Sequence, residues 1–149
     1  MRLGKYGKIL HYDKTSLGVG NIKRFVVFEF KYLGGIIVNV FNTVDQDRFH
    51  SHAFHAVSLM LRGFYNEDVV IGNTTIVKKI TPGIRFIPKN YIHKIKDSSK
   101  NAISITFGGP WDKTWNEYFD DMRIKTYSWG RKVLFDSKYF KKETNEENK

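Results

Sequence analysis

Apolar and polar residues alternate with a period of two along most of the chain. In residues 24–32, Val26, Phe28 and Phe30 share one face, while Glu29 and Lys31 share the other. Successive side chains of a strand point to opposite faces, so we expect a strand with Glu29 and Lys31 in water. The same reasoning, with turns at glycine or asparagine, predicts further strands over residues 36–41, 50–62, 64–71, 74–80 and 102–107.

Short strands at regular spacing, with almost no helical periodicity, are typical of antiparallel sandwiches and barrels. The pattern predicts an all-β fold, a single-domain antiparallel β-barrel or jelly roll formed by residues 1–140. Residues 1–21 are expected to form an arm or a short edge strand. Residues 112–140 are expected to form a short C-terminal extension that packs on the barrel as strands or a short helix. Residues 141–149 contain no apolar side chain, so we expect a disordered polar tail.

Composition limits the chemistry and the partners of the protein. The 149 residues include no cysteine, which excludes disulfides and thiolate ligands and leaves histidine, aspartate and glutamate to bind metals. The formal charge of +10 comes from basic residues spread along the chain, as on solvated strand faces, so non-specific nucleic-acid affinity is a secondary expectation. No stretch resembles a signal peptide or a membrane span, so a cytoplasmic location without a membrane partner is expected.

Histidines provide the candidate chemistry. His50 and His52 are two residues apart, so a strand would point both imidazoles to one side. His93 follows a proline turn about forty residues later, and imidazole nitrogen is a common ligand of transition metals. His55 has the opposite parity and is expected to be a packed or surface residue. The pattern predicts a metal site at His50, His52 and His93.

Two segments resemble the sequence motifs of the cupin superfamily, a group of small β-barrels. The first motif, G-x5-H-x-H-x3,4-E-x6-G, is approached within residues 45–63 by His50, His52 and Gly63. The second, G-x5-P-x-G-x2-H, is approached within residues 83–93. There the first gap is one residue short and Asn90 replaces a glycine, which is a mild change because asparagine tolerates the left-handed conformation.

The resemblance also places a metal-binding glutamate in the first motif, and Ala56 occupies its position here. We expect Glu67, which lies just beyond the Gly63 turn, to replace it as the fourth ligand. Arg62 ends the strand face that carries the histidines, and a guanidinium can bind a carboxylate or phosphate with two hydrogen bonds. Arg62 and Tyr65 are therefore predicted to act at the catalytic site. Further pocket candidates are Arg85, Tyr91, Ser104 and Thr106.

Such a site implies a divalent transition metal, with Fe(II) expected first and manganese, nickel or zinc as alternatives. By resemblance to the cupins, the function expected first is a small non-haem metal enzyme of the dioxygenase type acting on a small anionic substrate. One alternative is a non-catalytic module of the same fold that binds a ligand or nucleic acid. Another is a metal-independent enzyme similar to sugar-nucleotide epimerases. A homodimer that pairs through an edge strand is also expected.

Overall fold

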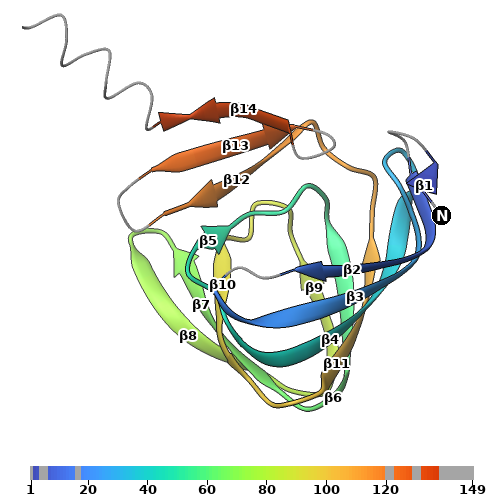
Figure 1. Ribbon diagram of the computed structural model, residues 1–149. Helices are drawn as coiled ribbons and strands as arrows, with labels where there is room; N and C mark the ends of the chain where they lie inside the picture. Colours follow the sequence, from blue (N-terminus) through green and yellow to red (C-terminus); the bar gives the residue numbers. More distant parts are fainter. Residues whose placement is uncertain (1, 4–6, 16–17, 120–122, 129–131, 138–149) are drawn as a thin grey trace, which may run out of the picture.

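The computed structural model describes residues 2–3, 7–15, 18–119, 123–128 and 132–137, and the elements in these ranges are β-strands (Figure 1). They form two seven-stranded sheets in which every paired strand is antiparallel. The all-β jelly-roll class predicted from the sequence is therefore confirmed. Within the same residues, the structure contains no helix of the length and apolarity that a membrane crossing requires.

The first sheet has the order β1-β2-β3-β4-β11-β6-β9 and the second β14-β13-β12-β5-β10-β7-β8. The strands of the first sheet are β1 (Arg2–Leu3), β2 (Gly7–Thr15), β3 (Val19–Phe30), β4 (Gly34–Asp45), β11 (Ala102–Gly108), β6 (Ala56–Arg62) and β9 (Gly83–Ile87). Those of the second are β14 (Lys132–Asp136), β13 (Ile124–Ser128), β12 (Thr114–Tyr118), β5 (Phe49–His50), β10 (His93–Ser98), β7 (Tyr65–Ile71) and β8 (Thr74–Ile80).

Both ends of the chain contribute more strand than the sequence predicted. The expected N-terminal arm contains the nine-residue strand β2, which pairs with β3 from Gly7 opposite Phe30 to Thr15 opposite Ile22. The C-terminal extension forms the strands β12, β13 and β14, which continue the second sheet beside β5 (Figure 1). The predicted polar tail, residues 141–149, lies outside the described residues.

The strand predicted over residues 50–62 is wrong as a single element. Its first part is β5, which belongs to the second sheet, and its last part is β6, which belongs to the first. Residues 51–55 connect the two sheets without regular strand structure. The alternating pattern does not reveal this break, because the chain resumes a similar alternation after it crosses.

The inner face of β3 also differs from the prediction, because the strand contains a β-bulge. Val26 pairs with Ile37 and Phe28 with Ile36, so Val27 is an extra residue on β3. An extra residue reverses the side-chain alternation beyond it. Glu29, expected in water, is instead only 7% exposed and lines the interior.

A hydrophobic cluster and a cavity share the space between the sheets. The cluster consists of buried residues from five strands, namely Phe41, Val44, Met60, Tyr65, Ile95 and Ala102. Beside it lies a cavity of about 960 Å³, and Phe41, Tyr65 and Ile95 line it as well. The buried side chain of Gln46 accepts a hydrogen bond from the backbone N–H of Ile95 (2.8 Å), which ties the end of β4 to β10 across the two sheets. The site described next lies in this cavity.

Candidate metal centre

Three histidines from different parts of the chain converge in the cavity. His50 on β5 pairs directly with His93, the first residue of β10. His52 follows two residues later in the connecting segment, where its backbone N–H donates to the carbonyl of Lys89 (2.9 Å). The nitrogen atoms that the three rings offer lie within 4.8 Å of one another. The structure therefore brings His50, His52 and His93 together, although through a strand and a loop rather than the continuous strand expected.

The spacing and the unused atoms of this cluster fit a metal ion. The Nε2 atoms of His52 and His93 are 3.1 Å apart. Two nitrogens that each lie about 2.1 Å from one metal are roughly 3 Å apart when the angle between them is near 90°. Nδ1 of His50 is buried and has no hydrogen-bond partner among the described residues. A buried polar atom is normally paired, so this atom is consistent with a ligand position.

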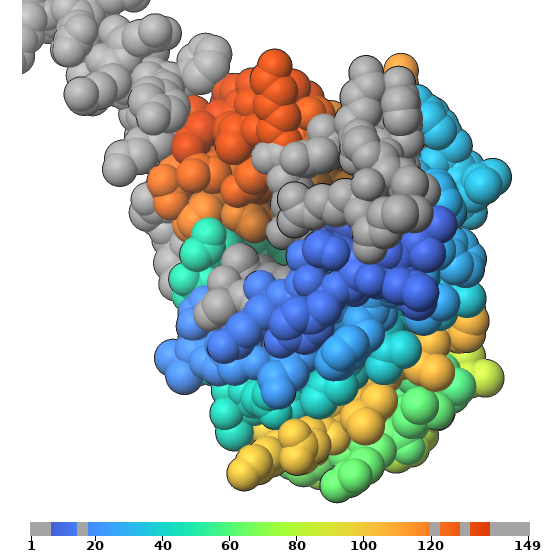
Figure 2. Space-filling model, turned by 45° about the vertical axis from the view of Figure 1, so that its right-hand side comes forward, coloured from blue at the N-terminus to red at the C-terminus, as the bar shows by residue number. Residues whose placement is uncertain are grey.

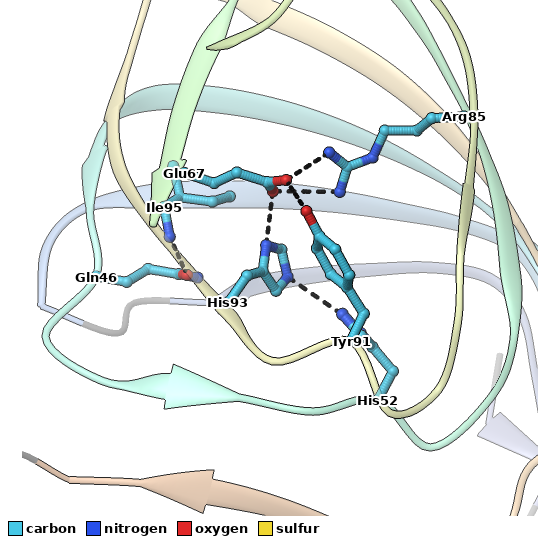
Figure 3. Close-up of polar contacts among 7 residues, drawn as sticks. All are labelled: Gln46, His52, Glu67, Arg85, Tyr91, His93 and Ile95. Atoms are coloured by element: carbon cyan, nitrogen blue, oxygen red, sulfur yellow. Dashed lines mark hydrogen bonds and ion pairs between the residues drawn. The ribbon is translucent and has the colours of Figure 1, made fainter. Parts of the chain in front are cut away.

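Glu67 lies behind His93 and accepts four hydrogen bonds (Figure 3). Its Oε1 accepts from Arg85 Nη1 (2.7 Å) and from the Tyr91 hydroxyl (2.5 Å). Its Oε2 accepts from Arg85 Nη2 (3.2 Å) and from His93 Nδ1 (2.7 Å). A carboxylate has about four acceptor positions, so Glu67 has none left for a metal. The structure thus gives Glu67 a different place from the expected ligand position, because it contacts His93, one of the candidate ligands.

This contact determines which nitrogen of His93 faces the other histidines. An ionised carboxylate only accepts hydrogen bonds, so Nδ1 of His93 carries the proton and Nε2 carries the lone pair. Nε2 is the atom directed at His52. Carboxylate–histidine contacts of this kind orient metal ligands in many proteins and make them more basic.

The surroundings favour neutral imidazoles and an ionised carboxylate. Burial and the electrostatic influence of nearby His93 lower the pKa of His52 to about 3. The same two causes, with His52, hold the pKa of His50 well below its usual range. Burial alone would raise the pKa of Glu67, but its hydrogen bonds with His93 and Arg85 outweigh burial and bring it to about 2. Metal ligation requires neutral histidines, and these shifts keep His50 and His52 neutral at neutral pH.

The predicted position of Arg62 in the pocket is wrong. A second bulge precedes it, because Met60 pairs with Ser104 whereas Arg62 pairs with Ile103. Met60 is buried, and Arg62 is exposed on the outer face and does not line the cavity. Arg85 on β9 and Arg24 on β3 line the cavity with their guanidinium groups instead.

The other predicted pocket residues lie at the cavity or beside it. Tyr65 is 5% exposed, lines the cavity, and has its pKa raised to about 12, chiefly by burial. Tyr91 contacts the site through Glu67. Ser104 and Thr106 line the wall formed by β11. His55 is exposed and stacks on the Phe86 ring, as expected of a surface residue.

The motif positions have clear structural roles. Ala56 is buried and lines the cavity, so a glutamate there would have reached the interior. Gly63 has a φ of +78° and lies against Ala102, which explains the glycine at the end of the first motif. Asn90 does not adopt the left-handed conformation, although it lies in a turn that a hydrogen bond from the N–H of Tyr91 to the carbonyl of Pro88 (3.0 Å) closes.

Sequence reasoning missed one carboxylate of the site, Glu117. It lies on β12 directly opposite His50, is 6% exposed, and lines the cavity. Its Oε2 accepts a hydrogen bond from the Tyr127 hydroxyl (2.8 Å) and is 3.5 Å from Arg48 Nη1. The predicted strand content of residues 112–140 was not specific enough to place Glu117 beside β5.

The comparisons with known proteins concern the fold. No family model and no curated protein matches the sequence. Among solved structures, the chain is similar to hydroxypropylphosphonic acid epoxidase from S. wedmorenis (TM-score 0.50, 13% identity), covering 66% of this chain and 55% of that one. It is similar to an RmlC-like cupin from Shewanella frigidimarina (TM-score 0.48, 20% identity), covering 67% and 85%. It is also similar to oxalate decarboxylase from Bacillus subtilis (TM-score 0.48, 12% identity), covering 70% and 29%.

Two antiparallel sheets that enclose a histidine cluster define a small jelly-roll barrel with a candidate metal centre. The chain shares its fold with the epoxidase, and this fold is the cupin-like barrel that the sequence motifs predicted.

Proposed function

We propose that the protein is a metal-dependent enzyme of the dioxygenase type, with Fe(II) as its metal and a small anionic molecule as its substrate. The observation that carries the proposal is the convergence of three imidazoles in a cavity large enough for a ligand. His50, His52 and His93 would hold the metal, and three protein ligands leave coordination positions open for substrate. When bound, the metal would act as a Lewis acid that orients a chelating substrate and activates dioxygen.

The charge of the site supports an anionic substrate. Imidazole ligands bring no negative charge, and the two carboxylates beside them, Glu67 at His93 and Glu117 opposite His50, are each matched by an arginine. Glu67 pairs with Arg85, and Glu117 lies 3.5 Å from Arg48. The protein therefore leaves most of the charge of a divalent ion uncompensated in a low-dielectric interior. A chelating anion would compensate it and bind more tightly than a neutral analogue.

The chain's own residues have positioning roles in this proposal. Glu67 holds Nδ1–H of His93 so that Nε2 faces the ion, and Arg85 and Tyr91 hold Glu67 in turn. The cluster formed by Phe41, Tyr65 and Ile95 excludes water from one side of the cavity. The substrate would enter the part of the cavity that these apolar side chains leave open and would bind the ion there.

Metal analysis tests the proposal directly. Protein purified without chelators is expected to contain close to one equivalent of iron or to take it up stoichiometrically. His50→Ala and His93→Ala should abolish this binding. His55→Ala is the matched control, because His55 lies five residues from His50 but on the surface. Oxygen consumption by the iron-loaded protein in the presence of small organic acids then tests the reaction type. Wild-type protein that binds no transition metal at micromolar concentration would refute the proposal.

One observation favours a second candidate, a metal-independent acid–base enzyme of the epimerase-like type. His93 and Glu67 form a dyad at 2.7 Å, the geometry in which a carboxylate orients a histidine base. In that case activity would survive complete removal of metal by a chelator and would be lost in His93→Ala. The same experiment on His52→Ala separates the two candidates, since a base at His93 does not need His52 as a ligand.

A further inference from the structure

A second group of polar side chains lines the cavity from the opposite sheet. The inner faces of β2 and β3 carry Lys8, Asp13, Arg24 and Glu29, and Lys31 follows directly after β3. All five residues line the same cavity as the histidines. Figure 2 shows these N-terminal strands, in blue, covering one face of the molecule between the orange C-terminal strands and the green and gold strands below. The histidines belong to the second sheet and its connecting segment, whereas this charged wall belongs to the first.

Glu29 is the unusual member of this wall. Its side chain is 9% exposed, and the cations with which it forms ion pairs, Lys8 and Arg24, are both 3.9 Å away, beyond hydrogen-bond distance. Its Oε1 is buried and has no hydrogen-bond partner among the described residues. Asp13 on the neighbouring strand contrasts with it, since it has Lys8 at 2.9 Å and His11 at 3.1 Å. A buried carboxylate oxygen without a donor is costly, so this atom is poised to accept a hydrogen bond from a ligand.

Hydroxyl groups continue the wall on the next strands of the same sheet. Asn39 on β4 pairs with Ser104 on β11, and its Nδ2 donates to Ser104 Oγ (3.3 Å) and Thr106 Oγ1 (3.1 Å). Each hydroxyl that accepts a hydrogen bond still has its own proton to donate. The wall thus combines a carboxylate acceptor at Glu29 with hydroxyl donors at Ser104 and Thr106.

We propose that this wall is a binding subsite for the hydroxyl groups of an organic acid whose carboxylate end faces the three histidines. The inference rests on the proposed function for the carboxylate end and adds the class of substrate, a polyhydroxylated carboxylic acid. Neutral hydroxyls suit Glu29 better than an ammonium group, because Lys8 and Arg24 already place two positive charges near it. The cavity volume of about 960 Å³ is at the upper end of the range for small-molecule sites, so it exceeds what a two- or three-carbon acid would fill.

Two probes of equal chain length test the subsite. Gluconate carries hydroxyl groups along its whole chain, whereas 2-hydroxyhexanoate keeps the same chelating end and has no further hydroxyls. Isothermal titration calorimetry of the metal-loaded protein is expected to show that gluconate binds at least tenfold more tightly than 2-hydroxyhexanoate. One hydrogen bond to a charged group contributes enough free energy for a difference of this size. Equal affinity for the two acids, or no binding of either, would overturn the proposal.

Single substitutions test which residues of the wall cause the preference for gluconate. Glu29→Gln should weaken gluconate binding about tenfold and leave 2-hydroxyhexanoate unchanged, because the lost acceptor touches only distal hydroxyls. Since Glu29→Gln also disturbs the ion pairs with Lys8 and Arg24, Thr106→Val is the second variant. It removes a hydroxyl without changing a charge, and we expect a loss of several-fold for gluconate only. The exposed Asp97→Asn is the matched control and should change neither affinity.

Repeating the titrations without metal separates this subsite from the proposed function. If the protein binds no metal but still prefers gluconate in a manner that depends on Glu29, the proposed function fails and the subsite stands. If metal binds with the expected stoichiometry and the two acids bind alike, the proposed function stands and the subsite fails.

Discussion

Replacing Glu67 with glutamine is the most informative single change at this site. The carboxylate is completely buried and accepts from three different side chains, so an amide in its place turns one acceptor into a donor that faces other donors. Arg85, with 19% of its side chain exposed, then loses its anionic partner. Breaking one side of a buried ion pair typically costs about 3–5 kcal/mol. Glu67→Gln should therefore lower the free energy of unfolding by about that amount.

The same change should weaken metal binding without removing a ligand. A glutamine no longer favours the proton on Nδ1 of His93, so Nε2 is less often free for the ion. Loss of such a supporting carboxylate typically reduces metal affinity about 10- to 100-fold. Urea denaturation of the metal-free protein measures the first effect, and titration with Co²⁺, followed by its visible spectrum, measures the second.

Two comparisons make the result decisive. The double variant Glu67→Gln/Arg85→Gln removes both charges and should recover part of the lost stability, which gives a coupling energy between the pair. Asp97→Asn on the surface should stay within about 0.5 kcal/mol of the wild type. A Glu67→Gln protein with unchanged Co²⁺ affinity would refute the link from Glu67 to the ligand. A Co²⁺ spectrum of the variant that indicates one ligand fewer than in the wild type would instead show that Glu67 binds the ion directly.

Three further results are expected. The pKa of His52 is about 3 in the fold against 6.5 for an ordinary histidine, so the unfolded chain binds more protons below pH 6.5. The free energy of unfolding of the metal-free protein, measured by urea denaturation, should thus fall as pH drops below 6.5, by roughly 1 kcal/mol per pH unit. The same pH dependence should be weaker in the His52→Ala variant. Below pH 4.5 the loss should steepen, because Glu67, with its pKa lowered to about 2, begins to be protonated first in the unfolded chain. Gly63→Ala should destabilise by about 2–4 kcal/mol in thermal or urea unfolding, since φ is +78° and the added Cβ would lie 2.8 Å from Ala102 Cβ. Arg62→Ala should leave metal affinity unchanged by calorimetry, and a large loss would mean that the outward position of Arg62 is wrong.

Local alternation and turn residues were sufficient to predict the fold class and the strands over residues 24–32, 36–41, 64–71, 74–80 and 102–107, because each depends on near neighbours in sequence. The β-bulges were not predictable in this way. The extra residue at Val27 turns Glu29 inward, and the bulge before Arg62 turns that side chain outward. Nothing in an alternating sequence marks which residue is the extra one, since bulges depend on the partner strand. The two errors in polarity therefore have the same physical cause.

The site was partly predictable for a similar reason. His50, His52 and His93 stand out by residue type and spacing, and these features survive the break between β5 and β6. The role of Glu67 depends on Arg85 and Tyr91, which come from β9 and from the loop after it. β7 and β9 belong to different sheets, so their contact follows from the packing of one sheet on the other. Local sequence patterns carry no information about such a contact.

The alanine at position 56 and the buried network at Glu67 are best understood together as a question of charge. A glutamate at position 56 would face the cavity and reduce the charge of a bound divalent ion. With Ala56 there, and with Glu67 neutralised by Arg85, the cavity keeps that charge and gains the space of the missing side chain. Both changes favour a substrate that supplies its own carboxylate. The absence of the motif glutamate therefore agrees with an active site as well as with a lost one, and metal stoichiometry in the wild type and in the Ala56→Glu variant distinguishes them. If the site is active, both proteins should bind one ion, and the variant should bind the ion more tightly and an anionic acid less tightly. If the site is lost, only the variant should bind the ion.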